Sequence, residues 1–152
     1  MQWSKLKSRI KSLIVPELRE RIDFHLTSYR ESHDGADKVW IEIDGARVFD
    51  CKYYLSERAT AYAYFDGLSG NEIKSALVDA GIHSPQDFGC AMRAYLDMPV
   101  DEALKSSDPI VRAFAIVDRR VGKRTLAKSD LASCDHALIK AFYDLRCRSA
   151  HI

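Results

Sequence analysis

The sequence predicts a single α+β domain, in which an N-terminal helix packs on a three-stranded antiparallel meander and a C-terminal helical cluster follows. Alternating apolar and polar residues over 21–27 and 38–50 indicate the strands. Helical periodicity at the N-terminus and again in the second half indicates the helices. Residues 1–66 are therefore expected to form the helix and meander and residues 67–152 the helical part, within one domain.

The first expected element is an amphipathic helix that Pro16 ends. Its apolar residues recur at helical spacing: Trp3, Leu6, Ile10, Leu13 and Ile14. Its other faces carry cations, with no acid before Glu17: Lys5, Lys7, Arg9 and Lys11. Such a face can attract a membrane surface or a nucleic acid. A solvated cationic face is the favoured interpretation, because the helix has only about three turns and its apolar stripe is needed by the sheet.

The first strand is expected over residues 21–27, where apolar and polar side chains alternate strictly. The inward residues are Ile22, Phe24 and Leu26, and the outward residues are Asp23, His25 and Thr27. A loop at residues 33–37 leads to a β-hairpin, whose type I′ turn is predicted at Asp44-Gly45. A two-residue turn fixes the register. The predicted cross-strand pairs are Ile43–Ala46, Glu42–Arg47, Ile41–Val48 and Trp40–Phe49.

The outward face of this sheet is the predicted binding surface, unless the C-terminal helices cover it. Its residues are Asp23, His25, Trp40, Glu42, Arg47 and Phe49. An aromatic pair beside a charge pair is unusual on a face meant only for water. Both alternatives require Trp40 and Phe49 to be in contact.

The same face holds the one candidate metal or acid–base site, formed by Asp23, His25 and Glu42. A polar rim around Trp40 is the favoured interpretation, because Arg47 is expected to compete for the Glu42 carboxylate and to repel a cation. The sequence contains no G-x-S-x-G, no phosphate-binding glycine loop and no H-E-x-x-H. We therefore expect no catalytic residue, no metal and no cofactor.

Helices are expected to fill the rest of the chain. Residues 51–65 are predicted to be helical, with a strand at 60–65 as the alternative. A capping box formed by Ser69 and Glu72 opens a helix that ends at Gly81. Further helices are expected from Ser84, over residues 109–121 and from Asp135. The 109–121 helix is apolar on nearly every side, so it should be central, and Gly122 closes it.

The start of that central helix, Asp108-Pro-Ile-Val-Arg-Ala, resembles the opening of a HEAT-repeat helix, but the sequence has no second copy and a well-capped buried helix is favoured. The cations that follow are Arg119, Arg120, Lys123, Arg124 and Lys128. We expect them at a helix C-terminus, where the macrodipole stabilises positive charge. An anion or nucleic-acid site is the alternative, disfavoured because no aromatic residues lie between the cations.

The overall composition is compatible with a cytoplasmic protein. The 23 Lys and Arg residues nearly cancel the 22 Asp and Glu residues, so no global field attracts nucleic acid or an anionic membrane. The four cysteines form no C-x-x-C and have no histidine at finger-like spacing, which indicates reduced thiols rather than structural zinc. No N-terminal apolar run is long enough for a signal peptide or a membrane span.

Several segments, taken together, resemble a family of short bacterial proteins of unknown function. They are the opening W-S-K-L-K, the hairpin sequence W-I-x-I-D-G, the segment D-R-R-V-G-K-R and the closing F-Y-D-L-R-C. The resemblance covers nearly the whole chain and implies a bacterial origin and a single domain. It implies no activity, cofactor or catalytic residue.

The function expected from the sequence is a non-catalytic binding or interaction module, such as an adaptor or an immunity-type inhibitor, whose partner is another protein. The first alternative is a nucleic-acid or anion binder that uses the basic segment at residues 119–128. The second is a metal-assisted hydrolase that uses Asp23, His25 and Glu42. The first alternative depends on whether the local positive charge binds nucleic acid, and the second depends on whether the protein holds a metal ion.

Overall fold

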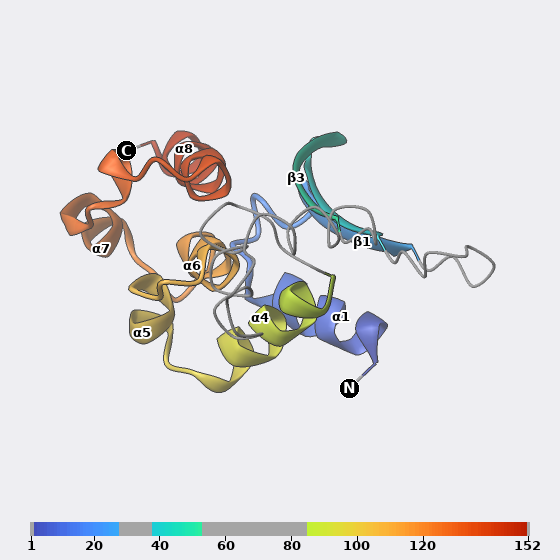
Figure 1. Cartoon of the computed structure of the whole chain (residues 1–152). Helices are drawn as coiled ribbons and strands as arrows, with labels where there is room; N and C mark the ends of the chain where they lie inside the picture. The colour runs from blue at the N-terminus through green and yellow to red at the C-terminus, as the bar shows by residue number, and fades with distance from the viewer. Residues whose placement is uncertain (1, 28–37, 53–84, 152) are drawn as a thin grey trace, which may run out of the picture.

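The computed structural model describes residues 2–27, 38–52 and 85–151 (Figure 1). It confirms the α+β class, with an N-terminal helix, a three-stranded antiparallel sheet and C-terminal helices. The first part comprises α1 (Trp3–Leu13), β1 (Ile22–Thr27), β2 (Lys38–Ile43) and β3 (Ala46–Lys52). The second comprises α4 (Pro85–Asp97), α5 (Val100–Leu104), α6 (Pro109–Ile116), α7 (Lys123–Lys128), the 3-10 helix η1 (Leu131–Ser133) and α8 (Ala137–Ala150).

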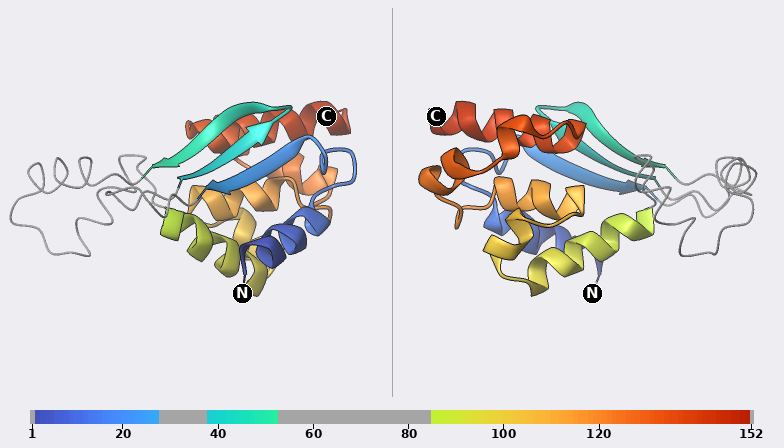
Figure 2. Two further views of the ribbon diagram at one scale, coloured as in Figure 1. Left: turned by 90° about the vertical axis from the view of Figure 1, so that its right-hand side faces the viewer. Right: turned by 60° about the vertical axis from the view of Figure 1, so that its left-hand side comes forward.

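The described helices gather on one side of the sheet, whose strand order is β1-β2-β3 (Figure 2). α6 packs against α4, α5 and α8, while α4 also contacts α1 and the sheet. The other face of the sheet carries no described helix (Figure 2). Within residues 2–27, 38–52 and 85–151, no helix is long and apolar enough to cross a membrane.

An aromatic cluster joins the sheet to three of these helices. The Phe24 ring of β1 lies 6.1 Å from the Trp3 ring of α1, 6.2 Å from the Phe88 ring of α4 and 5.7 Å from the Phe114 ring of α6, measured between centroids. Phe24, Phe88 and Phe114 are fully buried. Because each aromatic side chain removes a large apolar area from water, this cluster fixes how α1, α4 and α6 lie under the sheet.

The central position predicted for α6 is confirmed, since seven of its eight residues are buried. The Asp108 side chain caps it by accepting hydrogen bonds from the backbone N–H groups of Ile110 and Val111, as the Asp-Pro start predicts. The predicted end at residue 121 is wrong, because the helix stops at Ile116. There the chain leaves the helix to form an isolated β-bridge between Ile14 and Asp118.

Three other predicted boundaries need correction. Gly122 precedes α7 rather than closing the central helix. Cys51 and Lys52 belong to β3 because they pair with β2, so the helix predicted from residue 51 does not begin there. The last helix begins at Ala137, after His136, whose ring accepts from the Leu138 N–H. The rest of the 51–65 prediction and the 69–81 helix lie outside the described residues.

The hairpin turn is confirmed. Asp44 and Gly45 have φ values of +52° and +82°, the positive values that a type I′ turn requires at both central residues. The pairs Ile43–Ala46 and Glu42–Arg47 form as predicted. The turn is also held to β1, because the Arg21 guanidinium donates two hydrogen bonds, 2.9 and 2.8 Å long, to the Asp44 carboxylate.

Beyond Glu42 and Arg47 the predicted register is wrong. Ile41 pairs with Phe49 and Trp40 pairs with Asp50, so Val48 is one extra residue in β3, a β-bulge. Phe49 therefore shares the inner face with Ile41, and Trp40 and Phe49 lie on opposite faces of the sheet.

Burial explains the bulge. The bulge brings Cys51 into the core, where the Cys51 side chain is 0 % exposed, and it packs Phe49 against the core and the His136 ring. A regular register would turn both side chains outward. Phe49 is partly buried and Cys51 fully buried, so the apolar area that the bulge removes from water offsets the roughly 1 kcal/mol cost of one lost ladder hydrogen bond.

A buried carboxylate holds the connection between α6 and α7. Asp118 is 0 % exposed, and it accepts hydrogen bonds from the Tyr95 hydroxyl, from the Arg120 guanidinium and from the Arg120 backbone N–H. Burial raises the pKa of Asp118, but the hydrogen bonds from Arg120 and Tyr95 outweigh burial and bring the pKa below its ordinary value. Asp118 thus links α4, the end of α1 and the α6–α7 connection through Tyr95, Ile14 and Arg120.

We expect Asp118→Asn to lower the free energy of unfolding by about 2 kcal/mol at neutral pH, because it removes the charge of a buried carboxylate that accepts hydrogen bonds from the half-exposed Arg120 guanidinium. Asp97→Asn, at an exposed position of α4, is the matched control and should change it by less than about 0.5 kcal/mol. Because the folded-state pKa of Asp118 is lowered, its contribution is present above the unfolded pKa and is lost as the pH falls through the folded value. Urea unfolding at several pH values should therefore show the Asp118→Asn deficit shrinking in acid, and a constant deficit would contradict this account.

Candidate binding surface on the sheet

The outward residues of the three strands form one polar and aromatic surface, which we call the Trp40 face. Its central members are Asp23 and His25 of β1, Trp40 and Glu42 of β2, and Arg47 and Asp50 of β3, and the Thr27–Lys38 pair continues it along β1 and β2. Five of the six residues predicted from the sequence lie on it. Phe49 does not, because the bulge turns it to the inner face, and Asp50 takes the place opposite Trp40.

The Trp40 ring lies at the centre of this surface. The His25 ring stacks on it with a centroid separation of 5.1 Å and an interplanar angle of 22°. The Arg47 guanidinium carbon lies 4.1 Å from the Trp40 ring centroid, within the range of a cation–π contact. His25 and Arg47 come from the strands on either side of β2, so a row of planar groups crosses all three strands.

Glu42 anchors this row rather than pairing with its cross-strand neighbour. Its Oε1 accepts a hydrogen bond of 2.9 Å from the Trp40 indole Nε1–H, and its Oε2 lies 3.1 Å from the His25 Nε2. The Trp40 hydrogen bond is the main cause that holds the pKa of Glu42 below its ordinary value, and His25 adds to it. The predicted competition of Arg47 for this carboxylate is therefore wrong, because Trp40 and His25 occupy both of its oxygens.

The Asp23 carboxylate connects the Trp40 face to α1. Its Oδ1 lies 2.7 Å from the Lys7 Nζ and 3.6 Å from the Lys11 Nζ, and its Oδ2 lies 3.5 Å from the His25 Nε2. Partial burial raises the pKa of Asp23, but hydrogen bonds from Lys7 and from the Phe24 N–H outweigh it and the pKa falls below its ordinary value. These lysines were predicted only as a solvated face, since the sequence gives no sign that α1 lies against the edge of β1.

The Asp23, His25 and Glu42 side chains meet as the sequence predicts, yet their contacts limit their chemistry. Two carboxylate oxygens face His25 Nε2, and a carboxylate only accepts hydrogen bonds, so this nitrogen carries its hydrogen. Among the described residues, no hydroxyl or thiol forms a hydrogen bond to His25 that it could activate.

A metal ion at this point would meet two positive charges. In the part of the chain that the structure describes, no group of three His, Cys, Asp or Glu side chains is arranged to hold a metal. The physical reason at the Asp23 position is the pair of ammonium groups from Lys7 and Lys11, which satisfy the carboxylate and repel a divalent cation.

The basic segment lies at the opposite end of the molecule from the sheet (Figures 1 and 2). Its residues are Arg119, Arg120, Lys123, Arg124 and Lys128. The predicted position at a helix C-terminus is wrong for Lys123 and Arg124, which open α7, and the macrodipole, expected to account for part of the cluster, acts on Lys128 in the last turn. Arg120 is committed to Asp118 through hydrogen bonds as short as 2.6 Å.

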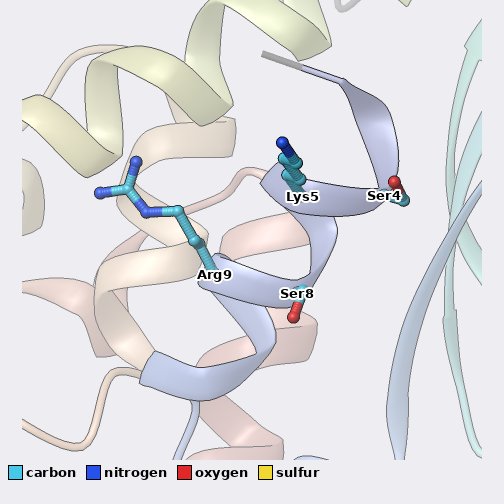
Figure 3. A pocket seen from close by; sticks show the side chains of 4 residues that line it. All are labelled: Ser4, Lys5, Ser8 and Arg9. Carbon is cyan, nitrogen blue, oxygen red and sulfur yellow. The ribbon is translucent and has the colours of Figure 1, made fainter.

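An open depression lies on the outer side of α1 and is lined by Ser4, Lys5, Ser8 and Arg9 (Figure 3). All four side chains project from a single helix and are exposed. The depression therefore offers no enclosed, convergent set of polar groups of the kind that defines a small-molecule site.

The fold and the Trp40 face together define a small α+β domain with helices under one side of its sheet and a half-exposed aromatic surface on the other. A model of the SF0329 protein family matches residues 2–147, so the chain belongs to the SF0329 protein family. This membership confirms the expected resemblance to a family of unknown function over nearly the whole chain, and the family description states no activity. Comparisons with curated proteins and with solved structures gave no match.

We expect purified protein to contain no stoichiometric zinc or manganese, because Lys7 and Lys11 already neutralise Asp23. Elemental analysis should find well below about one equivalent per chain, and EDTA should leave the thermal midpoint unchanged in the wild type and in His25→Ala. A bound equivalent of metal that His25→Ala removes would overturn this interpretation and favour metal-assisted hydrolysis.

Proposed function

We propose that the chain is a protein-binding module that presents the Trp40 face to another protein. One observation carries this proposal: a tryptophan and an arginine lie in contact on a sheet face where no described helix packs. Tryptophan and arginine are among the residues that most often dominate the energy of protein interfaces. A sheet face that only contacts water has no need of either.

The contacts within the face also support recognition. The Trp40 indole is held by Glu42, and the Arg47 guanidinium and the His25 ring stack against it. Side chains that already occupy their bound positions lose less conformational entropy when a partner docks. The row of planar groups is thus suited to a specific, rigid contact surface.

The charges on and beside the face are of both signs. The acidic groups are Asp23, Glu42 and Asp50, and the basic groups are Lys7, Lys11, Lys38 and Arg47. Because acidic and basic groups are interspersed, these residues do not form the uniformly positive surface that would concentrate a polyanion such as a nucleic acid. A protein surface with its own mixed charges is the partner class that this mixture favours.

We further propose a cytoplasmic location in a bacterium and the role of an adaptor or immunity-type inhibitor. The family resemblance supports the bacterial origin. The four cysteines support a reducing compartment, since Cys51, Cys90, Cys134 and Cys147 are all free thiols.

Trp40→Thr should abolish partner binding while the protein stays folded, because threonine suits a strand but removes the aromatic surface. Tagged wild type, Trp40→Thr and Glu102→Gln, an exposed α5 control, would be used to capture proteins from native cells under nuclease treatment. The proposal predicts a stoichiometric protein that the wild type and the control retain and Trp40→Thr loses. Calorimetry with that protein should show a loss of affinity of at least about 30-fold.

Two results of that experiment would contradict the proposal. One is the absence of any stoichiometric protein on the wild type, and the other is equal retention by Trp40→Thr. Thermal unfolding of each variant checks that a loss of binding is not a loss of folding.

The basic segment is the second candidate interface, and we expect it to bind nucleic acid only weakly. Arg119→Gln, Lys123→Gln and Arg124→Gln together should leave the affinity for a double-stranded oligonucleotide unchanged, because these cations have no interleaved aromatic residues and Arg120 is held by Asp118. Fluorescence anisotropy at several salt concentrations measures this. A wild-type dissociation constant of about 1 μM or tighter that weakens steeply with salt would favour nucleic-acid binding instead.

A further inference from the structure

We infer that Arg47 is a receptor for a carboxylate of the partner, so that the bound protein places an aspartate, a glutamate or its C-terminal carboxylate on the Arg47 guanidinium beside Trp40. This inference rests on the proposed function and names the chemistry of the group that docks. It follows from the hydrogen bonds of three side chains: Glu42 and Trp40 bond to each other, and Arg47 is left with unused donors.

Arg47 does not form the ion pair expected from its position in the sheet. Glu42 is its directly paired cross-strand neighbour, and an opposite-charge pair at such a position ordinarily forms an ion pair. Here the two Glu42 oxygens are taken by the Trp40 indole N–H at 2.9 Å and by His25 Nε2 at 3.1 Å. Among the described residues, Glu42 forms no ion pair with Arg47.

Arg47 has hydrogen-bond donors that no described residue uses. A guanidinium has five N–H donors, and among the described residues only one contact uses them, from Nη1 to the Asp50 Oδ1 at a long 3.4 Å. The Arg47 side chain is 50 % exposed, so solvent and a ligand can reach it. A carboxylate can accept two parallel hydrogen bonds from such a fork.

The Trp40 ring also fixes the orientation of the Arg47 guanidinium. The Trp40 ring lies 4.1 Å below the guanidinium carbon and holds the planar group against the sheet instead of leaving it to move freely. An arginine held in this way loses less entropy when it forms a bidentate pair. A lysine at this position could supply the charge but not the fork.

The surrounding charges select a carboxylate over a phosphate. Asp50 and Glu42 flank Arg47, so they repel a dianion or a chain of phosphates more strongly than a single carboxylate, whose binding must come from the bidentate hydrogen bonds. The lysines of α1 do not change this locally, because Lys7 and Lys11 lie at the Asp23 carboxylate on the far strand. A protein carboxylate next to an apolar group that meets the Trp40 edge therefore fits best.

The test uses the α-amide of N-acetylglutamate as the carboxylate probe and the α-amide of N-acetylglutamine as its neutral match. Both are titrated into labelled full-length protein at constant ionic strength, and NMR follows the Trp40 Nε1–H and Arg47 Nε–H signals. The inference predicts saturable shifts with the glutamate probe and none with the glutamine probe. Arg47→Lys should weaken binding about tenfold, read from Trp40, and Asp50→Asn should strengthen it about threefold, because a competing carboxylate is removed.

Two outcomes would overturn the inference. One is the absence of a saturable shift, or a shift that Arg47→Lys leaves unchanged. The other is inorganic phosphate binding more tightly than the carboxylate probe in an Arg47-dependent way, which would assign the site to a phosphoryl ligand. Neither outcome depends on capture of a partner through Trp40, so the inference can fail while the proposed function stands.

Discussion

The β-bulge at Val48 is the constraint on which the two faces of the sheet depend. One extra residue in β3 changes which side every later side chain of that strand faces, because side chains alternate along a strand. It puts Cys51 in the core, packs the partly buried Phe49 against the core, and leaves Asp50 opposite Trp40 on the other face. Without it, the helices would lose two apolar contacts and the outward face would gain a second aromatic ring.

The bulge also determines the polar contacts of the Trp40 face, one after another. Because Asp50 rather than Phe49 lies opposite it on β3, the Trp40 ring packs against His25 of β1 and the Arg47 side chain. Its indole N–H needs an acceptor, and Glu42 on the same strand supplies it. Glu42 therefore forms no ion pair with Arg47, and among residues 2–27, 38–52 and 85–151 only Asp50 accepts a hydrogen bond from the guanidinium.

The sequence predicts well what is decided locally. The Asp44-Gly45 turn and the Asp108-Pro109 cap each depend on residues that lie within a few positions of one another, and both are confirmed. The alternation over residues 21–27 likewise places Asp23 and His25 together on one face.

What the sequence does not reveal depends on contacts between distant segments. The end of α6 is set by the bridge from Ile14 to Asp118, which no local pattern encodes. The bulge did leave a signal: Arg47 and Asp50 are polar residues three apart, and strict alternation cannot place both on one face. A two-residue turn fixes the register only of the pairs next to it, so a bulge beyond Arg47 is compatible with the same turn.

The most direct test of this account is a set of proton–proton distances at Trp40, measured as nuclear Overhauser effects on the folded protein. The account predicts cross-peaks from the Trp40 ring to the His25 ring and to the Arg47 side chain, and from the Phe49 ring to His136. A cross-peak between the Trp40 and Phe49 rings would contradict it, because it would restore the regular register and remove the Trp40 face as described.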